Sequence, residues 1–93
     1  MAIVVEFYGI PRVRAGVSRT SVCDDLDTVP FGQVIAEVAR RFPVFGDCCT
    51  QEGRTLLDGY IASIDGLRFV EREEEPIVAS GQSVLILSAD AGG

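Results

Sequence analysis

The sequence contains no histidine among its 93 residues. Histidine is the commonest general base near neutral pH and the commonest metal ligand in proteins. No grouping of acidic and nucleophilic residues has the spacing of a catalytic constellation. Adjacent Cys48 and Cys49 form neither a Cys-x-x-Cys redox motif nor half of a zinc site. We therefore expect a protein that is not an enzyme and that binds no metal and no cofactor of its own.

Long apolar runs are also missing, since none approaches the ~20 residues that a membrane-spanning helix needs. The first six residues lack the basic start and the long apolar region of a signal peptide. Cysteine is scarce and odd in number, at Cys23, Cys48 and Cys49. Without a secretory signal, such cysteines are typical of reduced thiols. These features predict a cytoplasmic protein that makes no membrane contact.

Positive charge is in short supply, with 8 basic against 14 acidic residues and a formal net charge of −6. Such a surface repels phosphate backbones, so we expect no nucleic-acid binding. It suits a partner with a basic docking face. Four of the five residues 71–75 are acidic, namely Glu71, Glu73, Glu74 and Glu75, and they are interpreted as a solvated loop, with steering toward a basic partner as the alternative. Asp24, Asp25 and Asp27 lack the spacing of a calcium loop and are attributed to electrostatics at a helix start.

Residues 2–23 predict a β-hairpin. Alternation over residues 2–8 places Ile3, Val5 and Phe7 on one face and Val4, Glu6 and Tyr8 on the other. Glu6 marks the wetter face, so Tyr8 is expected on the exposed side of the sheet. Residues 9–16 predict a turn, and residues 17–23 a second, antiparallel strand.

A change of period from two to 3.6 predicts a helix over residues 28–42. Thr28 is a suitable N-cap, Pro30 fits the first turn, and Pro43 ends the helix. The expected apolar face consists of Phe31, Val34, Ile35, Val38, Ala39 and Phe42. Residues 43–59 show no clear period, and we expect a short helical turn or a bent strand near residues 54–57.

The last third of the chain predicts short strands. Residues 60–65 alternate with Tyr60, Ala62 and Ile64 inward, and Asp65-Gly66 is a strong hairpin turn. Residues 67–70, 76–78 and 84–87 follow as further strands. We expect the last of these to be central, beside the first strand. The fold class is thus α+β, with a mixed sheet of four to five strands covered by one main helix.

The chain ends in Ser88-Ala89-Asp90-Ala91-Gly92-Gly93 directly after this apolar strand. Together with the start at residues 3–9, the helix and residues 60–66, this ending resembles the β-grasp fold of ubiquitin. More closely, the chain is similar to the MoaD/ThiS family of sulfur-carrier proteins over nearly its whole length. Two features depart from the family pattern: Ser88-Ala89 stands where Pro-Pro is frequent, and the segment 72–78 is longer.

The resemblance implies one domain over residues 1–93, with residues 88–93 as a flexible, protruding tail. It implies that a partner resembling ubiquitin-activating enzymes, an adenylyltransferase, uses ATP to adenylate the Gly93 carboxylate. A persulfide sulfur then displaces AMP and leaves a thiocarboxylate. A sulfur-accepting synthase subunit passes this sulfur into molybdopterin, the thiazole of thiamine, or cysteine. Gly92 and Ala91 are slim enough to thread a narrow channel, because glycine has no Cβ.

Two other functions stay open at this stage. The chain is alternatively a ubiquitin-like modifier joined to lysines through Gly93, or a β-grasp binding module with an inert tail. We expect Tyr8, Leu67 and Leu87 to form a partner-binding patch near the tail, although scattered surface apolar residues usually carry no function. The free chain is expected to be a monomer.

Overall fold

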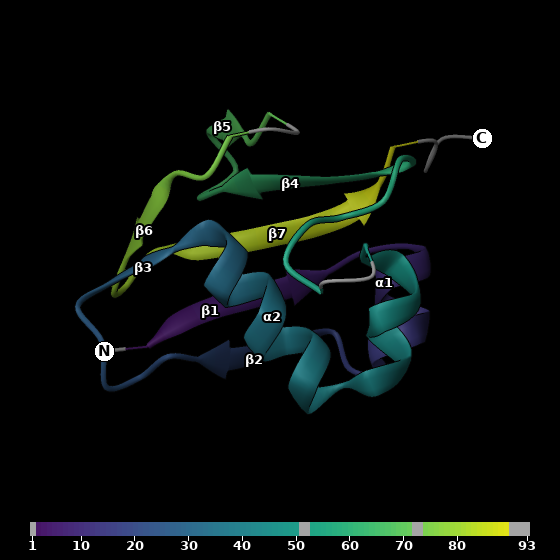
Figure 1. Ribbon diagram of the computed structural model, residues 1–93, viewed down its shortest axis with the longest axis horizontal. Coiled ribbons are helices and arrows are strands. Elements are labelled where there is room, and N and C mark those ends of the chain that lie inside the picture. The colour runs from purple at the N-terminus through teal and green to yellow at the C-terminus, as the bar shows by residue number, and fades with distance from the viewer. Residues whose placement is uncertain (1, 51–52, 72–73, 90–93) are drawn as a thin grey trace.

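The computed structural model describes residues 2–50, 53–71 and 74–89. Its elements, in chain order, are β1 (Ile3–Phe7), α1 (Ile10–Ala15), β2 (Arg19–Val22), β3 (Thr28–Pro30), α2 (Phe31–Arg41), the 3-10 helix η1 (Pro43–Cys48), β4 (Tyr60–Ile64), β5 (Arg68–Phe69), β6 (Ile77–Ala79) and β7 (Ser83–Ser88). Five strands form one sheet in the order β2-β1-β7-β4-β5, while β3 and β6 pair separately. Helix α2 crosses one face of the larger sheet (Figure 1).

Strand β7 lies at the centre of the larger sheet. It runs parallel to β1 and antiparallel to β4, and these three strands are flanked by β2 and β5. The sheet is therefore mixed, and the predicted α+β class, the single main helix and the central last strand are confirmed.

The core lies between the sheet and α2. Ile3, Val5 and Phe7 are at most 1% exposed, as their alternation predicts. The residues that face them from α2 include Val34, Ile35 and Val38, all fully buried. Burial of this apolar surface is the main source of stability of the fold.

The predicted start of the main helix is wrong. Residues 28–30 form strand β3, in which Val29 is fully buried and pairs with Val78 of β6. Helix α2 begins only at Phe31, whose N–H donates to the Pro76 carbonyl at 2.8 Å. Pairing with β6 therefore outweighs the local capping preference of Thr28. The first turn of α2 holds no acidic residue, so the proposed role of the aspartates at the helix start is also wrong.

The expected turn over residues 9–16 contains helix α1. Pro11 lies in its first turn, where the missing N–H costs no hydrogen bond. At its end, the Gly16 N–H donates to the Arg12 carbonyl at 2.9 Å. The bracketing glycines and the early proline were the available signals, but six residues are too few to show a helical period.

Residues 43–59 contribute to the core. The helical turn lies at η1 rather than near residues 54–57, where Leu56 instead forms an antiparallel bridge with Cys49. Phe45 of η1 is fully buried, and its ring centroid lies 5.4 Å from that of Phe7 in an edge-on arrangement. This segment therefore closes one end of the core.

Cys48 and Cys49 are buried, at 0% and 6% exposed, and burial raises the pKa of Cys49 to about 12. Cys23 follows β2 rather than continuing it, and it packs half-buried against the core. Because thiolates are the reactive species, we expect iodoacetamide at pH 8 to label native Cys23 first and slowly. Cys48 and Cys49 should react only in denaturant. Intact mass and peptide mapping test this, and native labelling of Cys49 at the rate of Cys23 would contradict it.

Asp65 connects the β4–β5 turn to the start of β7. Its carboxylate accepts the Ser83 N–H at 2.8 Å, the Ser83 hydroxyl at 3.2 Å and the Gln82 side-chain amide at 3.1 Å. The hydrogen bond from the Ser83 backbone is the main reason that the pKa of Asp65 is lowered. Its φ of 57° lies in the left-handed region, which Asp and Asn tolerate better than most residues.

We expect Asp65→Ala to lower the free energy of unfolding by about 1 kcal/mol, since the carboxylate is exposed to water. Asp65→Asn keeps an acceptor and tolerates the same φ, so its loss should be smaller. The pKa of Asp65 is lower in the folded than in the unfolded protein. Its charged carboxylate therefore stabilises the fold at pH values above the unfolded pKa of about 4, and this stabilisation is lost as the pH falls from that value through the folded-state pKa. Urea unfolding at pH 7 and pH 3 measures this. An Asp65→Ala protein as stable as the parent at pH 7 would refute the role of the turn.

Candidate functional site

The last residues of β7 are held on both sides. Ser88 is 4% exposed, and its hydroxyl oxygen accepts the Ile10 N–H at 3.3 Å. On the other side, the Ala89 N–H donates to the Gly59 carbonyl at 2.6 Å. Ser88 is therefore part of the strand and Ala89 is bonded to the domain, so the predicted tail is wrong at these two residues. Ser88 has a structural contact here that a proline, with no side-chain hydroxyl, could not make.

Gly9 permits this close arrangement. A Cβ at Gly9 would lie 3.1 Å from the Ser88 hydroxyl oxygen, and its φ of 66° is one that side-chain-bearing residues rarely adopt. Figure 1 shows α1, which follows Gly9, beside the end of β7. The predicted reactive Gly93 and the threading residues Gly92 and Ala91 lie outside the described residues.

Tyr8, directly after β1, lies beside Leu87 of β7 in the register of the two strands, near this end of the sheet. The Tyr8 N–H donates to the Ile86 carbonyl at 2.9 Å, next to Leu87. Tyr8 is 45% exposed, and its hydroxyl donates to Glu6 Oε2 at 2.9 Å, which raises the pKa of Tyr8. Leu87 is half-buried on the face opposite the core residue Ile86. The predicted placement of Tyr8 on the exposed side, opposite the face of Phe7, is therefore confirmed.

Leu67 lies elsewhere. It is 89% exposed in the turn that follows Ile64, and Ile64 is opposite Val84 at the beginning of β7. Leu87 is opposite Ile61, three positions further along, which corresponds to roughly 10 Å. The structure therefore brings Tyr8 and Leu87 together and leaves Leu67 at the far end of the strand pair. The sequence predicted the turn but not its direction relative to the tail.

Three further apolar residues share this outer face. Ile61 is opposite Leu87, and Leu85 is opposite Ser63, which in turn is opposite Phe69. Directly opposite residues point to the same face of a sheet, and Phe69 is 63% exposed. We call Tyr8, Ile61, Phe69, Leu85 and Leu87 the outer patch. Alternation could have suggested Ile61 and Leu85, but Phe69 required the register of β5.

Charge is unevenly distributed around the tail base. Residues 9–22 contain Arg12, Arg14 and Arg19 and no acidic residue. All three arginines are exposed, and Arg14 lies 3.9 Å from Asp47. Acidic side chains lie beside them, because Glu6 is opposite Arg19 across β1 and β2, and Asp58 precedes Gly59, to which Ala89 bonds.

Within residues 2–50, 53–71 and 74–89, no group of three His, Cys, Asp or Glu residues is placed to hold a metal ion. Over the same residues, no helix has the length and apolarity needed to cross a bilayer.

No protein-family model matches the sequence, and no curated protein matches it. Solved structures do. SAMP1 from Haloferax volcanii has a TM-score of 0.77 at 17% identity, covering 100% of both chains. A crystal structure of small archaeal modifier protein 1 of H. volcanii has a TM-score of 0.73 at 16% identity, covering 94% of this chain and 95% of that one.

A third solved structure is a Pyrococcus furiosus protein assigned as molybdopterin converting factor, subunit 1. Its TM-score is 0.66 at 17% identity, and the match covers 95% of this chain and 97% of that one. At such low identity the likeness concerns the fold, which agrees with the sheet order and the single main helix described above. The chain therefore has the ubiquitin-like β-grasp fold that these small modifier and MoaD-like proteins share.

Proposed function

We propose that this protein is a sulfur carrier whose reacting group is its own C-terminal carboxylate at Gly93. The observation that supports this most is that the end of the central strand β7 is fixed at Ser88 and Ala89, directly before the sequence Asp90-Ala91-Gly92-Gly93. A β-grasp domain that holds its last strand firmly and continues into small residues is suited to presenting that end to another protein.

The chemistry needs an activating partner because a carboxylate is a poor electrophile. In the proposed first step, a Gly93 carboxylate oxygen attacks the α-phosphorus of ATP, and pyrophosphate leaves. A persulfide of the partner then attacks the acyl carbon, and AMP leaves with the shared oxygen. A thiol reductant cleaves the resulting S–S bond and leaves a thiocarboxylate on Gly93. A synthase subunit then consumes this sulfur.

The outer patch is proposed as the surface that docks onto the activating partner. It lies on the solvent-facing side of the central strands, and Tyr8 and Leu87 lie closest to the tail base. Exposed apolar residues that gather on one face are a frequent feature of protein–protein interfaces. The arginines of residues 9–22 add a charge pattern that would orient the approach.

Pyrophosphate exchange tests the first step. We expect the native chain, its cognate activating enzyme and Mg-ATP to exchange labelled pyrophosphate into ATP. A chain lacking Gly93 should give only the rate of the enzyme alone, because no carboxylate reaches the activating site. Tail deletion leaves the described core intact, so unfolding would not explain the loss. Native protein that no cognate activator adenylates would overturn the proposal.

A second candidate function is a modifier joined to lysines of other proteins. The structural likeness to small archaeal modifier protein 1 favours it, and its first chemical step is the same. The sequence contains no lysine, so copies of this chain offer one another no lysine acceptor. Digestion with a protease that cuts after Asp90 would leave Ala-Gly-Gly on modified lysines. Such remnants on cellular proteins would support the modifier function, and their absence beside a detected thiocarboxylate would support the carrier alone.

A further inference from the structure

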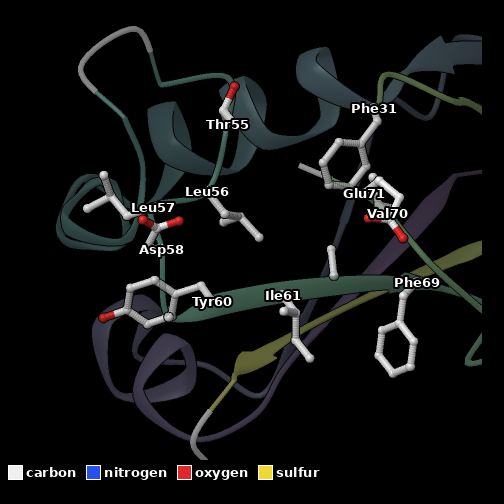
Figure 2. Close-up of a pocket in the computed structure, with 12 residues that line it drawn as sticks. Phe31, Thr55, Leu56, Leu57, Asp58, Tyr60, Ile61, Phe69, Val70 and Glu71 are labelled. Atoms are coloured by element: carbon white, nitrogen blue, oxygen red, sulfur yellow. The ribbon is translucent and has the colours of Figure 1, made fainter. Parts of the chain in front are cut away.

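A pocket of about 410 Å³ opens at the edge of the sheet beside β4 (Figure 2). Its inner wall includes Phe31 from the start of α2, Leu56 from the loop between η1 and β4, and Ala62 of β4. These residues are 6%, 8% and 2% exposed, respectively. At the mouth, Phe69 is 63% exposed. Functional ligand pockets begin at roughly 300 Å³, so this one has room for a large side chain.

One half of the β4 edge faces this pocket. Strand β7 pairs with β4 along its full length, whereas β5 pairs with only Ser63 and Ile64. Beyond them, a single hydrogen bond from the Val70 N–H to the Ala62 carbonyl, at 2.9 Å, continues the ladder. At the other end of this half, the Tyr60 N–H donates to the Leu57 carbonyl at 3.2 Å, so loop residues rather than a strand hold this side of β4. The pocket between these segments therefore suits a side chain of a partner rather than an added strand.

The charge at the rim is negative. Among the described residues that line the pocket, the charged ones are Asp58 and Glu71, and none is basic. Glu71 makes no ion pair within the described part of the chain. Arg54 and Arg68, on the neighbouring segments, already pair with Glu75 and Glu74. A ligand that carries positive charge beside an apolar group is therefore complementary to this rim.

We propose that this pocket binds a segment of a partner protein in which a large apolar residue lies beside arginine or lysine. The apolar side chain packs against Phe31 and Leu56, and the basic side chain pairs with Glu71. The site goes beyond the proposed carrier function, because it needs none of the tail residues. It nevertheless lies beside the tail base, since Gly59 lines the pocket and bonds to Ala89.

Titration of the isotopically labelled protein with two capped peptides, followed by amide chemical shifts, tests this proposal. One peptide has the sequence Gly-Arg-Leu-Phe-Arg-Gly, and the other replaces both arginines with glutamate. We expect the basic peptide to shift the amides of Leu56, Tyr60 and Ala62 in a saturable way. The acidic peptide should bind at least about fivefold more weakly, which is the effect of one to two exposed charge pairs.

Two exposed variants with the same charge change separate the pocket from general electrostatics. Glu71→Arg should weaken the basic peptide by about fivefold. Asp25→Arg, in the exposed β2–β3 connection away from the pocket, should change the affinity less than about twofold. A chain lacking Gly93 should bind the peptide as well as the full chain, so failure of the tail chemistry would leave this result unaffected.

Three results would overturn the proposal. They are an absence of saturable shifts at millimolar peptide, equal binding of the basic and acidic peptides, and shifts confined to the outer patch around Leu85 and Leu87. An equal loss in Glu71→Arg and Asp25→Arg would likewise show attraction to net charge rather than a pocket.

Discussion

Phe45→Ala is expected to lower the free energy of unfolding by about 3–5 kcal/mol. Phe45 is fully buried, and its ring packs edge-on against Phe7, which also contacts Phe42 at a centroid distance of 6.2 Å. Truncation removes the transfer free energy of the ring and leaves a cavity at the end of the core. Since small domains have only about 5–15 kcal/mol of stability, the variant should be largely unfolded at moderate urea.

Urea unfolding monitored by circular dichroism measures this effect, and Val44→Ala is the matched control. Val44 is the neighbouring residue of η1 but is 55% exposed, so its truncation should cost less than about 0.5 kcal/mol. Equal midpoints for the two variants would mean that η1 does not close the core as described.

Leu87→Arg is expected to reduce kcat/KM for adenylation by the activating partner by roughly 30-fold, the effect of losing about 2 kcal/mol at an interface hot spot. Leu87 is half-buried on the outer face and points away from the core, so the arginine has access to water. A charge at the centre of the outer patch would then lie unpaired against an apolar partner surface, while the fold is retained.

Leu67→Arg supplies the control for the same change of residue. Leu67 is 89% exposed and lies at the far end of the β4–β7 pair, so its replacement should alter kcat/KM less than about threefold. Both variants should show unfolding midpoints close to that of the parent. A larger loss in Leu67→Arg than in Leu87→Arg would place the docking surface at the β4–β5 turn instead.

Much of the fold follows from local periodicity. The alternation of Ile3, Val5 and Phe7 predicts one buried face of β1, and the 3.6-residue spacing of Val34, Ile35 and Val38 predicts the buried face of α2. Both patterns repeat within a single element, so neighbouring residues carry the information. Where burial depends on a distant segment, this signal fails.

Val29 and Phe45 show how it fails. The residues around Val29 have good helix-cap chemistry, yet the strand pairing with Val78 decides their conformation. Phe45 lies in a stretch without a clear period, and its burial depends on Phe7, far away in the sequence. The candidate site behaves in the same way: alternation predicted the faces of Tyr8 and Leu87, whereas separating Leu67 from them required the direction and register of β4.

The mass of the intact protein after activation tests the central claim most directly. The native chain would be incubated with its activating enzyme, Mg-ATP, a persulfide sulfur source and a thiol reductant. We predict a mass increase equal to the replacement of one oxygen by sulfur, located by fragmentation at Gly93 and absent from a chain lacking that residue. The carrier function would be contradicted by a native chain that is adenylated but never gains sulfur. In that case, Ala-Gly-Gly remnants on lysines of other proteins, left by cleavage after Asp90, would indicate the modifier function.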